Sequence, residues 1–198
     1  QTSTALDIPS AEDVPVVSID GQTLVPMSTQ GGKIITVTTD TLILSIDTKG
    51  GDVVSANLAK FPVEQNSAES YSILRPSGDT LHIAQSGLIG PDGTDSKGRP
   101  TYTATQDSYT LEGDTLTVPL ELITPQGMQV TKNFVFTRGS HKINVIYNVK
   151  NNTSNPKRVI PFGQLKQSIL GEGGSMFMPV YRGGAFSIED DKYEKYSF

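Results

Sequence analysis

Cysteine and tryptophan are absent from this 198-residue chain, and histidine occurs only twice. Without cysteine there is no thiol nucleophile, no disulfide and no cysteine-ligated zinc site. His82 and His141 alone offer little for a metal centre or a serine–histidine relay. We therefore predict no catalytic residue, no cofactor and no metal ligand.

Basic runs and long apolar runs are also missing. Sixteen Lys and Arg residues stand against 21 Asp and Glu, which gives a formal charge of −5, and the longest basic run is the pair Lys157-Arg158. This balance disfavours nucleic acid or an anionic membrane surface as the main partner. No stretch approaches the roughly 18–20 apolar residues of a membrane span.

Two segments show the alternation of apolar and polar residues that is typical of β-hairpins. In the first, residues 42–46 alternate, and Gly50-Gly51 supplies a turn into residues 53–58. In the second, residues 116–122 and 130–136 flank a Gln-Gly turn. No window shows a clean helical period, and residues 67–71 offer one turn of helix at most.

Two later segments predict how the sheets are covered. Residues 143–149 place Ile143, Val145, Tyr147 and Val149 on one face, with the polar Lys142, Asn144, Asn148 and Lys150 on the other, so one side of this strand is expected to be buried. Residues 159–170 are strand-like but contain Pro161, which predicts an edge strand or a bulge. The pattern as a whole predicts an all-β antiparallel sandwich of two sheets.

Composition divides the chain into two parts. Residues 1–32 carry acidic side chains, several prolines and no basic residue, so we predict a flexible acidic linker that follows a membrane anchor outside this sequence. Residues 33–198 form the predicted sandwich domain. The last residues still alternate at Phe198, so we expect the domain to be incomplete at its C-terminal end.

Three segments raise the question of ligand binding. Asp92 to Gly98, within a predicted loop over residues 86–100, offers carboxylates for calcium, but the spacing fails the EF-hand pattern and a hydrated turn is favoured. The trio Glu189-Asp190-Asp191 is interpreted as a solvated turn rather than a metal or partner patch. The stretch 171–174 is rich in glycine but lacks the features of a phosphate loop.

A histidine could pair with a carboxylate such as Glu121 or Glu64 for proton transfer, but a histidine on the polar face of a strand is ordinarily solvated, and that interpretation is favoured. Residues 162–169 suggest a different role. There, Leu165 and Ile169 are predicted to face the core, while Gln164, Lys166 and Ser168 point outward. Such a face beside an edge strand suits either a docking surface or an ordinary edge strand.

Several stretches resemble the large periplasmic domain of the YidC family of membrane protein insertases. They are Thr48–Val53, Gln85–Gly93, Gly163–Ile169, Arg182–Ala185 and Asp191–Tyr196, in the order of that domain. The resemblance covers about residues 33–198. It implies a β-supersandwich, similar to mutarotases and sugar-binding proteins, on the periplasmic side of the bacterial inner membrane.

The resemblance also implies an accessory, non-catalytic role. The insertion of nascent inner-membrane proteins belongs to transmembrane parts that this sequence lacks, and the domain of the family contacts the Sec translocon, notably SecF. The matching region implies these partner-binding residues: Gly163, Gln164, Lys166, Gln167, Ser168, Arg182, Tyr193, Glu194, Lys195 and Tyr196. The alternative, by analogy of fold, is a carbohydrate-binding or mutarotase-like domain.

Overall fold

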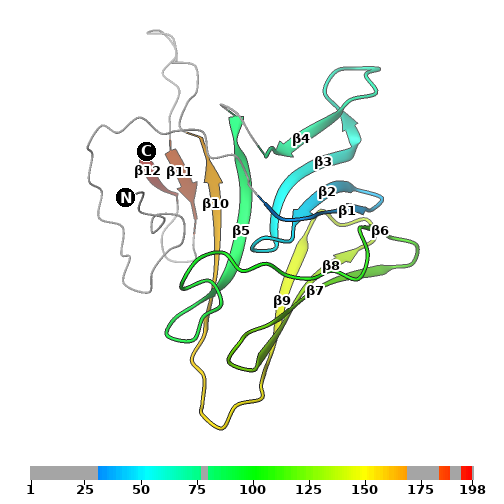
Figure 1. Cartoon of the computed structure of the whole chain (residues 1–198). Coiled ribbons are helices and arrows are strands. Elements are labelled where there is room, and N and C mark those ends of the chain that lie inside the picture. Colours follow the sequence, from blue (N-terminus) through cyan, green and yellow to red (C-terminus); the bar gives the residue numbers. More distant parts are fainter. Residues whose placement is uncertain (1–30, 77–79, 169–182, 188–192, 198) are drawn as a thin grey trace.

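The computed structural model describes residues 31–76, 80–168, 183–187 and 193–197 (Figure 1). Within these ranges the named elements are all strands and no α-helix occurs, so the all-β prediction is confirmed. Residues 67–69 form no helical turn; they lead by a bend into β4 (Ser70–Leu74). No helix long and apolar enough to cross a membrane occurs in the part of the chain that is described.

The larger sheet has seven strands in the order β10-β5-β3-β2-β1-β6, with β4 paired to β3 beside this path. Neighbouring strands are antiparallel except β1 and β6, which are parallel. Besides β4, the strands of this sheet are β1 (Ile34–Thr38), β2 (Leu42–Asp47), β3 (Asp52–Pro62), β5 (His82–Ile89), β6 (Ser108–Thr110) and β10 (Ile160–Gln167).

The smaller sheet is an antiparallel meander of β7 (Thr115–Ile123), β8 (Met128–Thr137) and β9 (Ile143–Asn151). Both predicted hairpins are confirmed, as β2–β3 and β7–β8. In the first, Gly50 and Gly51 have φ values of 78° and 62°, a region that glycine adopts at little steric cost. A further two-stranded sheet pairs β11 (Gly183–Phe186) with β12 (Glu194–Ser197).

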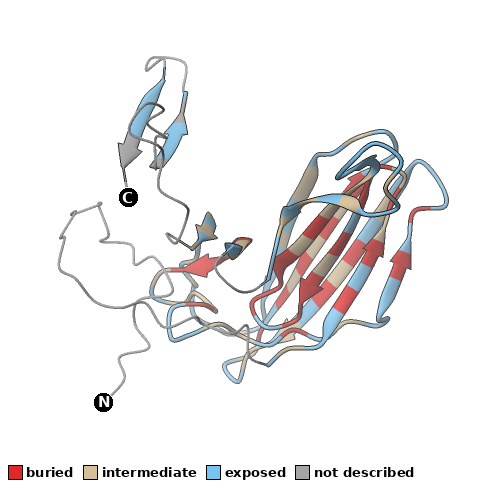
Figure 2. Cartoon of the chain, turned by 90° about the horizontal axis from the view of Figure 1, so that it is seen from above, coloured by how far each residue is buried: buried red, intermediate tan, exposed pale blue. Residues whose placement is uncertain are grey.

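The larger and smaller sheets face each other and enclose one core, which confirms the sandwich (Figure 1). Buried and exposed residues alternate along the strands, as Figure 2 shows. The core residues that are at most 2% exposed come from both sheets and include Ile35, Val37, Leu42, Leu44, Ile46, Val118, Leu120, Val130, Phe134 and Phe136.

Two predictions about strands need correction. On β9, Ile143 and Tyr147 pack against the core, but Val145 and Val149 are 37% and 39% exposed. This strand is the last of the smaller sheet, so its inner face is only partly covered. The loop predicted from Ser86 begins later, because β5 continues to Ile89.

Candidate functional site: an edge strand in front of a buried charged centre

Strand β10 carries four of the ten predicted docking residues and lies at one end of the seven-stranded sheet. It pairs with β5 in an unbroken antiparallel register from Ile160 opposite Ile89 to Gln167 opposite His82. Pro161 lies within this strand, so the edge predicted from that proline is confirmed. Gly163 and Gln167 are exposed, whereas Gln164, Lys166 and Ser168 are partly buried.

The predicted burial pattern of β10 is wrong, although Leu165 does lie opposite Ala84, on the face of β5 that packs against the core. Leu165, expected in the core, is 69% exposed, and Gln164, expected to point outward, donates from Nε2 to Oε1 of Gln85 at 2.8 Å. The reason is the polar side chain that β5 places opposite Gln164, since Gln85 is buried and can satisfy an amide. Ile169 lies outside the described residues.

The second group of predicted docking residues surrounds β12. Glu194, Lys195 and Tyr196 belong to this strand. Tyr193, directly before it, is 64% exposed, and the ammonium of Lys195 lies 5.0 Å from its ring centroid. Arg182, the stretch 171–174 and the acidic trio at 189–191 lie outside the described residues. The two groups of docking residues therefore belong to different sheets.

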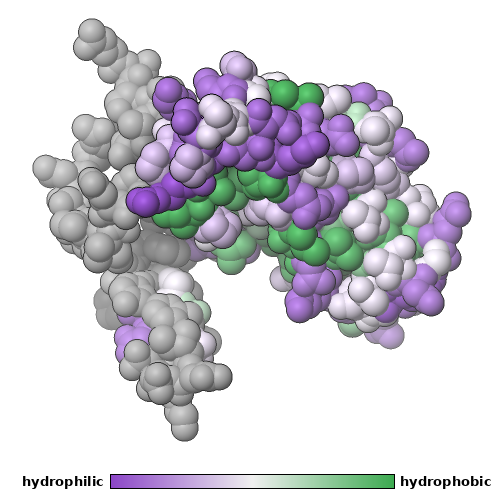
Figure 3. Space-filling model, turned by 90° about the horizontal axis from the view of Figure 1, so that it is seen from below, coloured by the Kyte–Doolittle hydropathy of each residue, from purple (hydrophilic) through white to green (hydrophobic). Residues whose placement is uncertain are grey.

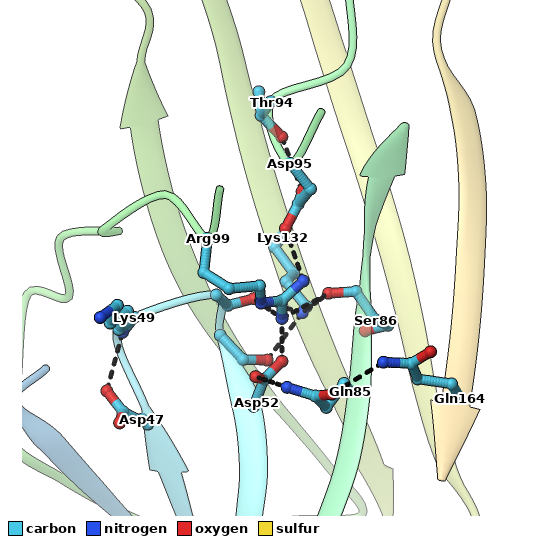
Figure 4. Close-up of polar contacts among 12 residues, drawn as sticks. Asp47, Lys49, Asp52, Gln85, Ser86, Thr94, Asp95, Arg99, Lys132 and Gln164 are labelled. Atoms are coloured by element: carbon cyan, nitrogen blue, oxygen red, sulfur yellow. Dashed lines mark hydrogen bonds and ion pairs between the residues drawn. The ribbon is translucent and has the colours of Figure 1, made fainter. Parts of the chain in front are cut away.

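Behind β10 lies a group of buried polar side chains that the sequence analysis missed. We call Asp52, Gln85, Asp95, Arg99 and Lys132 the charged centre (Figure 4). It joins the two sheets, because Lys132 comes from β8 and Asp52 and Gln85 come from β3 and β5. Asp95 and Arg99 come from the loop that follows β5.

Lys132 is fully buried, yet its ammonium has a complete set of acceptors. Nζ donates to the carbonyl oxygens of Gly50, Gly51 and Ser86 at 2.9, 2.6 and 2.9 Å. It also lies 5.3 and 5.5 Å from the ring centroids of Phe134 and Tyr147. Three carbonyl oxygens match the three protons of an ammonium. Because these oxygens belong to the β2–β3 turn and to β5, Lys132 connects β8 to the larger sheet.

Arg99 lies between the two carboxylates of the charged centre. Its Nη1 donates to Asp95 at 2.5 Å and its Nη2 to Oδ1 of Asp52, and all three side chains are at most 8% exposed. Its guanidinium also lies 5.7 Å from the ring centroid of Phe162 on β10. Two cations and two carboxylates thus balance each other, which is what buried charges require.

Burial governs the protonation of these groups. It raises the pKa of Asp52 and of Asp95, and Arg99 opposes this effect in both. Burial lowers the pKa of Lys132 to about 7, opposed by the neighbouring Asp52. Burial also raises the pKa of Tyr147, whose hydroxyl donates to Oγ of Ser86 at 3.2 Å.

Asp95 overturns the prediction of a hydrated turn at residues 92–98. Its side chain is fully buried and accepts from the backbone N–H of Leu88 at 2.9 Å and from Oγ1 of Thr94 at 3.0 Å. The carboxylate fits against β5 at Gly87, where an added Cβ would lie only 2.5 Å from Cγ of Asp95. Asp92 instead stays near the surface and binds Lys157 Nζ at 2.8 Å.

The two histidines make other contacts than the proposed acid–base pair. Nδ1 of His82 lies 3.0 Å from the carbonyl oxygen of Ile73, and the ring of His141 is 6.3 Å from that of Phe61. Among the described residues, no group of three or more potential metal-ligating side chains comes together. Within the charged centre, Arg99 pairs with the carboxylates of Asp52 and Asp95.

One sequence signal marked this centre. Lys132 stands between Val130 and Phe134 on the face of β8 that alternation assigns to the core. A charged residue at such a position is almost never buried without partners. The partners are distant in sequence, with Gly51 81 residues away, and no pattern in the chain identified them.

Fold and site together define an antiparallel β-sandwich domain with a neutralised charged centre behind one edge strand. The family model for the YidC periplasmic domain matches residues 34–198, and the chain belongs to that family. It is thus a periplasmic domain of the inner-membrane insertase family, and the resemblance noted from its motifs is confirmed.

The curated relatives are longer than this chain. A membrane protein insertase YidC from Pseudoalteromonas atlantica is 55% identical over 199 residues, which cover 100% of the chain and 37% of the relative. The protein of the same name from Vibrio atlanticus is 48% identical over 87% of the chain and 33% of its own length. One from Vibrio cholerae is 46% identical over 84% of the chain and 31% of its own length. The chain spans about a third of the length of these relatives.

Proposed function

We propose that this domain is the non-catalytic docking part of a membrane protein insertase. Its partner is the Sec translocon, through the accessory subunit SecF, and its contact surface comprises β10 and the residues around β12. The remainder of the full-length protein handles the nascent inner-membrane proteins, and residues 1–32 tether the domain, which comprises residues 33–198. The match of the family model from residue 34 onward supports this division.

The observation that carries the docking role is the exposed leucine on the edge strand. Leu165 is 69% exposed on β10, beside the exposed Gly163 and Gln167. Apolar residues also form part of the surface on the face seen in Figure 3. An exposed apolar side chain on a strand at the end of a sheet suits a partner that lies along that strand.

The non-catalytic role is supported by the way in which the buried titratable groups are used. Arg99 bridges both buried carboxylates, and the ammonium of Lys132 is surrounded by backbone carbonyl oxygens. Side chains that are bonded to one another inside a packed core cannot contact a substrate.

Affinity capture of SecF from solubilised inner membranes tests the docking role in the full-length protein. Leu165→Asp should reduce capture by about tenfold, the effect of losing one well-packed apolar contact. The matched control is Ile123→Asp, because Ile123 is also 69% exposed but lies on β7 of the smaller sheet. Undiminished capture by the Leu165 variant, or an equal loss in both variants, would refute docking through β10.

A further inference from the structure

The charged centre is connected to the proposed docking strand by one continuous series of hydrogen bonds between side chains (Figure 4). We propose that Asp52 and Gln85 are positioning residues for β10: they hold Gln164 against Gln85 and so determine which face of the strand is presented to a partner. The effect on partner binding rests on the proposed docking function, whereas the positioning of β10 rests on the hydrogen bonds alone.

The series begins at Arg99 and ends at the edge of the sheet. Nη2 of Arg99 donates to Oδ1 of Asp52, and Oδ2 of Asp52 accepts from Nε2 of Gln85 at 2.8 Å. Oε1 of Gln85 then accepts from Nε2 of Gln164 at 2.8 Å. Asp52 and Gln85 are 5% and 6% exposed, so solvent competes little for these bonds.

The direction of this series is fixed by chemistry. An ionised carboxylate only accepts, so Asp52 requires the amide nitrogen of Gln85 to point inward. The amide oxygen of Gln85 must then point toward β10, where only a donor satisfies it. Gln164 meets this requirement, whereas an apolar side chain at the same position would leave the oxygen of Gln85 without a partner.

The strand between the centre and the edge is itself held tightly. Ser86 O accepts from both Lys132 and Arg99, at 2.9 and 3.1 Å, and the N–H of Leu88 donates to Asp95 at 2.9 Å. Together with Gln85 and the close approach of Asp95 to Gly87, these contacts fix four consecutive residues of β5. Because β10 pairs with β5 along its whole length, the fixed backbone of β5 also fixes the position of β10.

Strand geometry links the two faces of β10: Gln164 lies on the face turned to Gln85, and Leu165 lies on the opposite face, beside Ala84 of β5. Successive side chains of a strand point to opposite faces, so a slip of one residue would exchange the two. The bond from Gln164 to Gln85 favours one of these registers. The charged centre therefore determines, through the register of β10, on which face of the strand Leu165 lies.

Asp52→Asn tests the direction of the series with almost no change in shape. The amide oxygen introduced at position 52 can still accept from Arg99, but the new amide nitrogen then faces the nitrogen of Gln85. Adding Gln85→Glu restores an acceptor at position 85, both for the new amide at position 52 and for Gln164, and restores the native net charge.

A second variant, Gln85→Leu, removes the hydrogen bonds of Gln85 to Asp52 and to Gln164 without changing the charge. Gln129→Leu, on the exposed face of β8, is the matched control.

The readouts are amide hydrogen exchange in the full-length protein and capture of SecF. Asp52→Asn and Gln85→Leu should speed exchange within residues 160–167 by about tenfold relative to β2, as expected for the loss of a buried hydrogen bond. Capture should fall with them, and the double variant Asp52→Asn, Gln85→Glu should recover both to within about twofold of the native values. Gln129→Leu should change neither.

The possible results separate this inference from the docking function. Unchanged exchange in β10, or equal acceleration in β10 and β2, would overturn the positioning role. Accelerated exchange in β10 alone, with capture unchanged, would support the positioning role and overturn docking through β10. Recovery of exchange in the double variant would establish the direction of the hydrogen bonds, because neither substitution restores the native residue.

Discussion

The apolar core and the charged centre meet in one pair of residues, Leu120 on β7 and Lys132 opposite it on β8. Both side chains are fully buried. Leu120 is stabilised by packing that depends on area and shape, and it needs no particular partner. Lys132 requires three correctly placed carbonyl oxygens. A change at Leu120 therefore acts through lost packing, whereas a change at one member of the charged centre leaves another member without its partner.

The largest effect is expected from removing Arg99. Arg99→Leu leaves the buried carboxylates of Asp52 and Asp95 without their shared partner and should reduce the free energy of unfolding by roughly 3–5 kcal/mol. Arg138→Leu is the control, because the exposed Arg138 bonds only backbone carbonyl oxygens; its cost should stay at about 1 kcal/mol or less. Urea unfolding measures both, and equal losses would contradict the distinction.

In the apolar core, a substitution should reduce the free energy of unfolding by as much as Arg99→Leu or less. Leu120→Ala creates a cavity in the core and should cost roughly 2–5 kcal/mol, depending on how far the neighbours relax. Ile123→Ala, on the same strand but 69% exposed, should cost less than about 0.5 kcal/mol. Urea unfolding of the two variants compares them directly. A loss at Leu120 no larger than that at Ile123 would contradict the burial of this face.

The protonation of Lys132 predicts a dependence on pH. Its pKa is lowered by burial to about 7, from an ordinary value of 10.5 in the unfolded chain. Between these values the unfolded state binds more protons than the folded state, so stability should rise with pH across this window. In Lys132→Met this rise should disappear. Urea unfolding across the window measures the difference, and parallel curves would mean that the carbonyl oxygens keep the ammonium charged.

The smallest effect is expected at the surface carboxylate of the same loop. Asp92 accepts from the N–H of Arg158 and from Lys157, and these bonds lower its pKa below the ordinary 3.8. A carboxylate with a lowered pKa contributes stability above 3.8 that is lost as the pH falls through its folded value. Thermal melts of Asp92→Asn should lose that part of the acid sensitivity, with a slightly lower midpoint than the native chain well above 3.8 and a similar midpoint in acid. An unaltered acid profile would exclude the contribution.

The sequence predicts those parts of the fold that depend on local pattern. Alternation identified β2–β3, β7–β8 and the sandwich, and Pro161 predicted an edge strand or a bulge, of which the edge is found. These features follow from neighbours in sequence, because side-chain alternation and turn residues act over a few positions.

The charged centre and the exposure of the β10 side chains could not be predicted in this way. Arg99 and Asp52 are 47 residues apart, and Gln164 and Gln85 are 79 apart. When these partners are not known, the sequence predicts that the apolar Leu165 is buried and that the polar Gln164 is exposed. For the same reason Asp95 resembled a residue of a hydrated turn, although Asp-Gly and Gly-rich sequences also suit a loop that folds back onto a sheet.

The most direct test of the account is the coupling between Gln85 and Gln164. Hydrogen exchange in β10 is measured for Gln85→Leu, Gln164→Leu and the double variant in the full-length protein. If the charged centre supports β10 through this contact, the double variant should lose no more than the larger single loss, which corresponds to a coupling of about 1 kcal/mol. Strictly additive effects of the two substitutions would contradict the claim that the buried centre positions the edge strand.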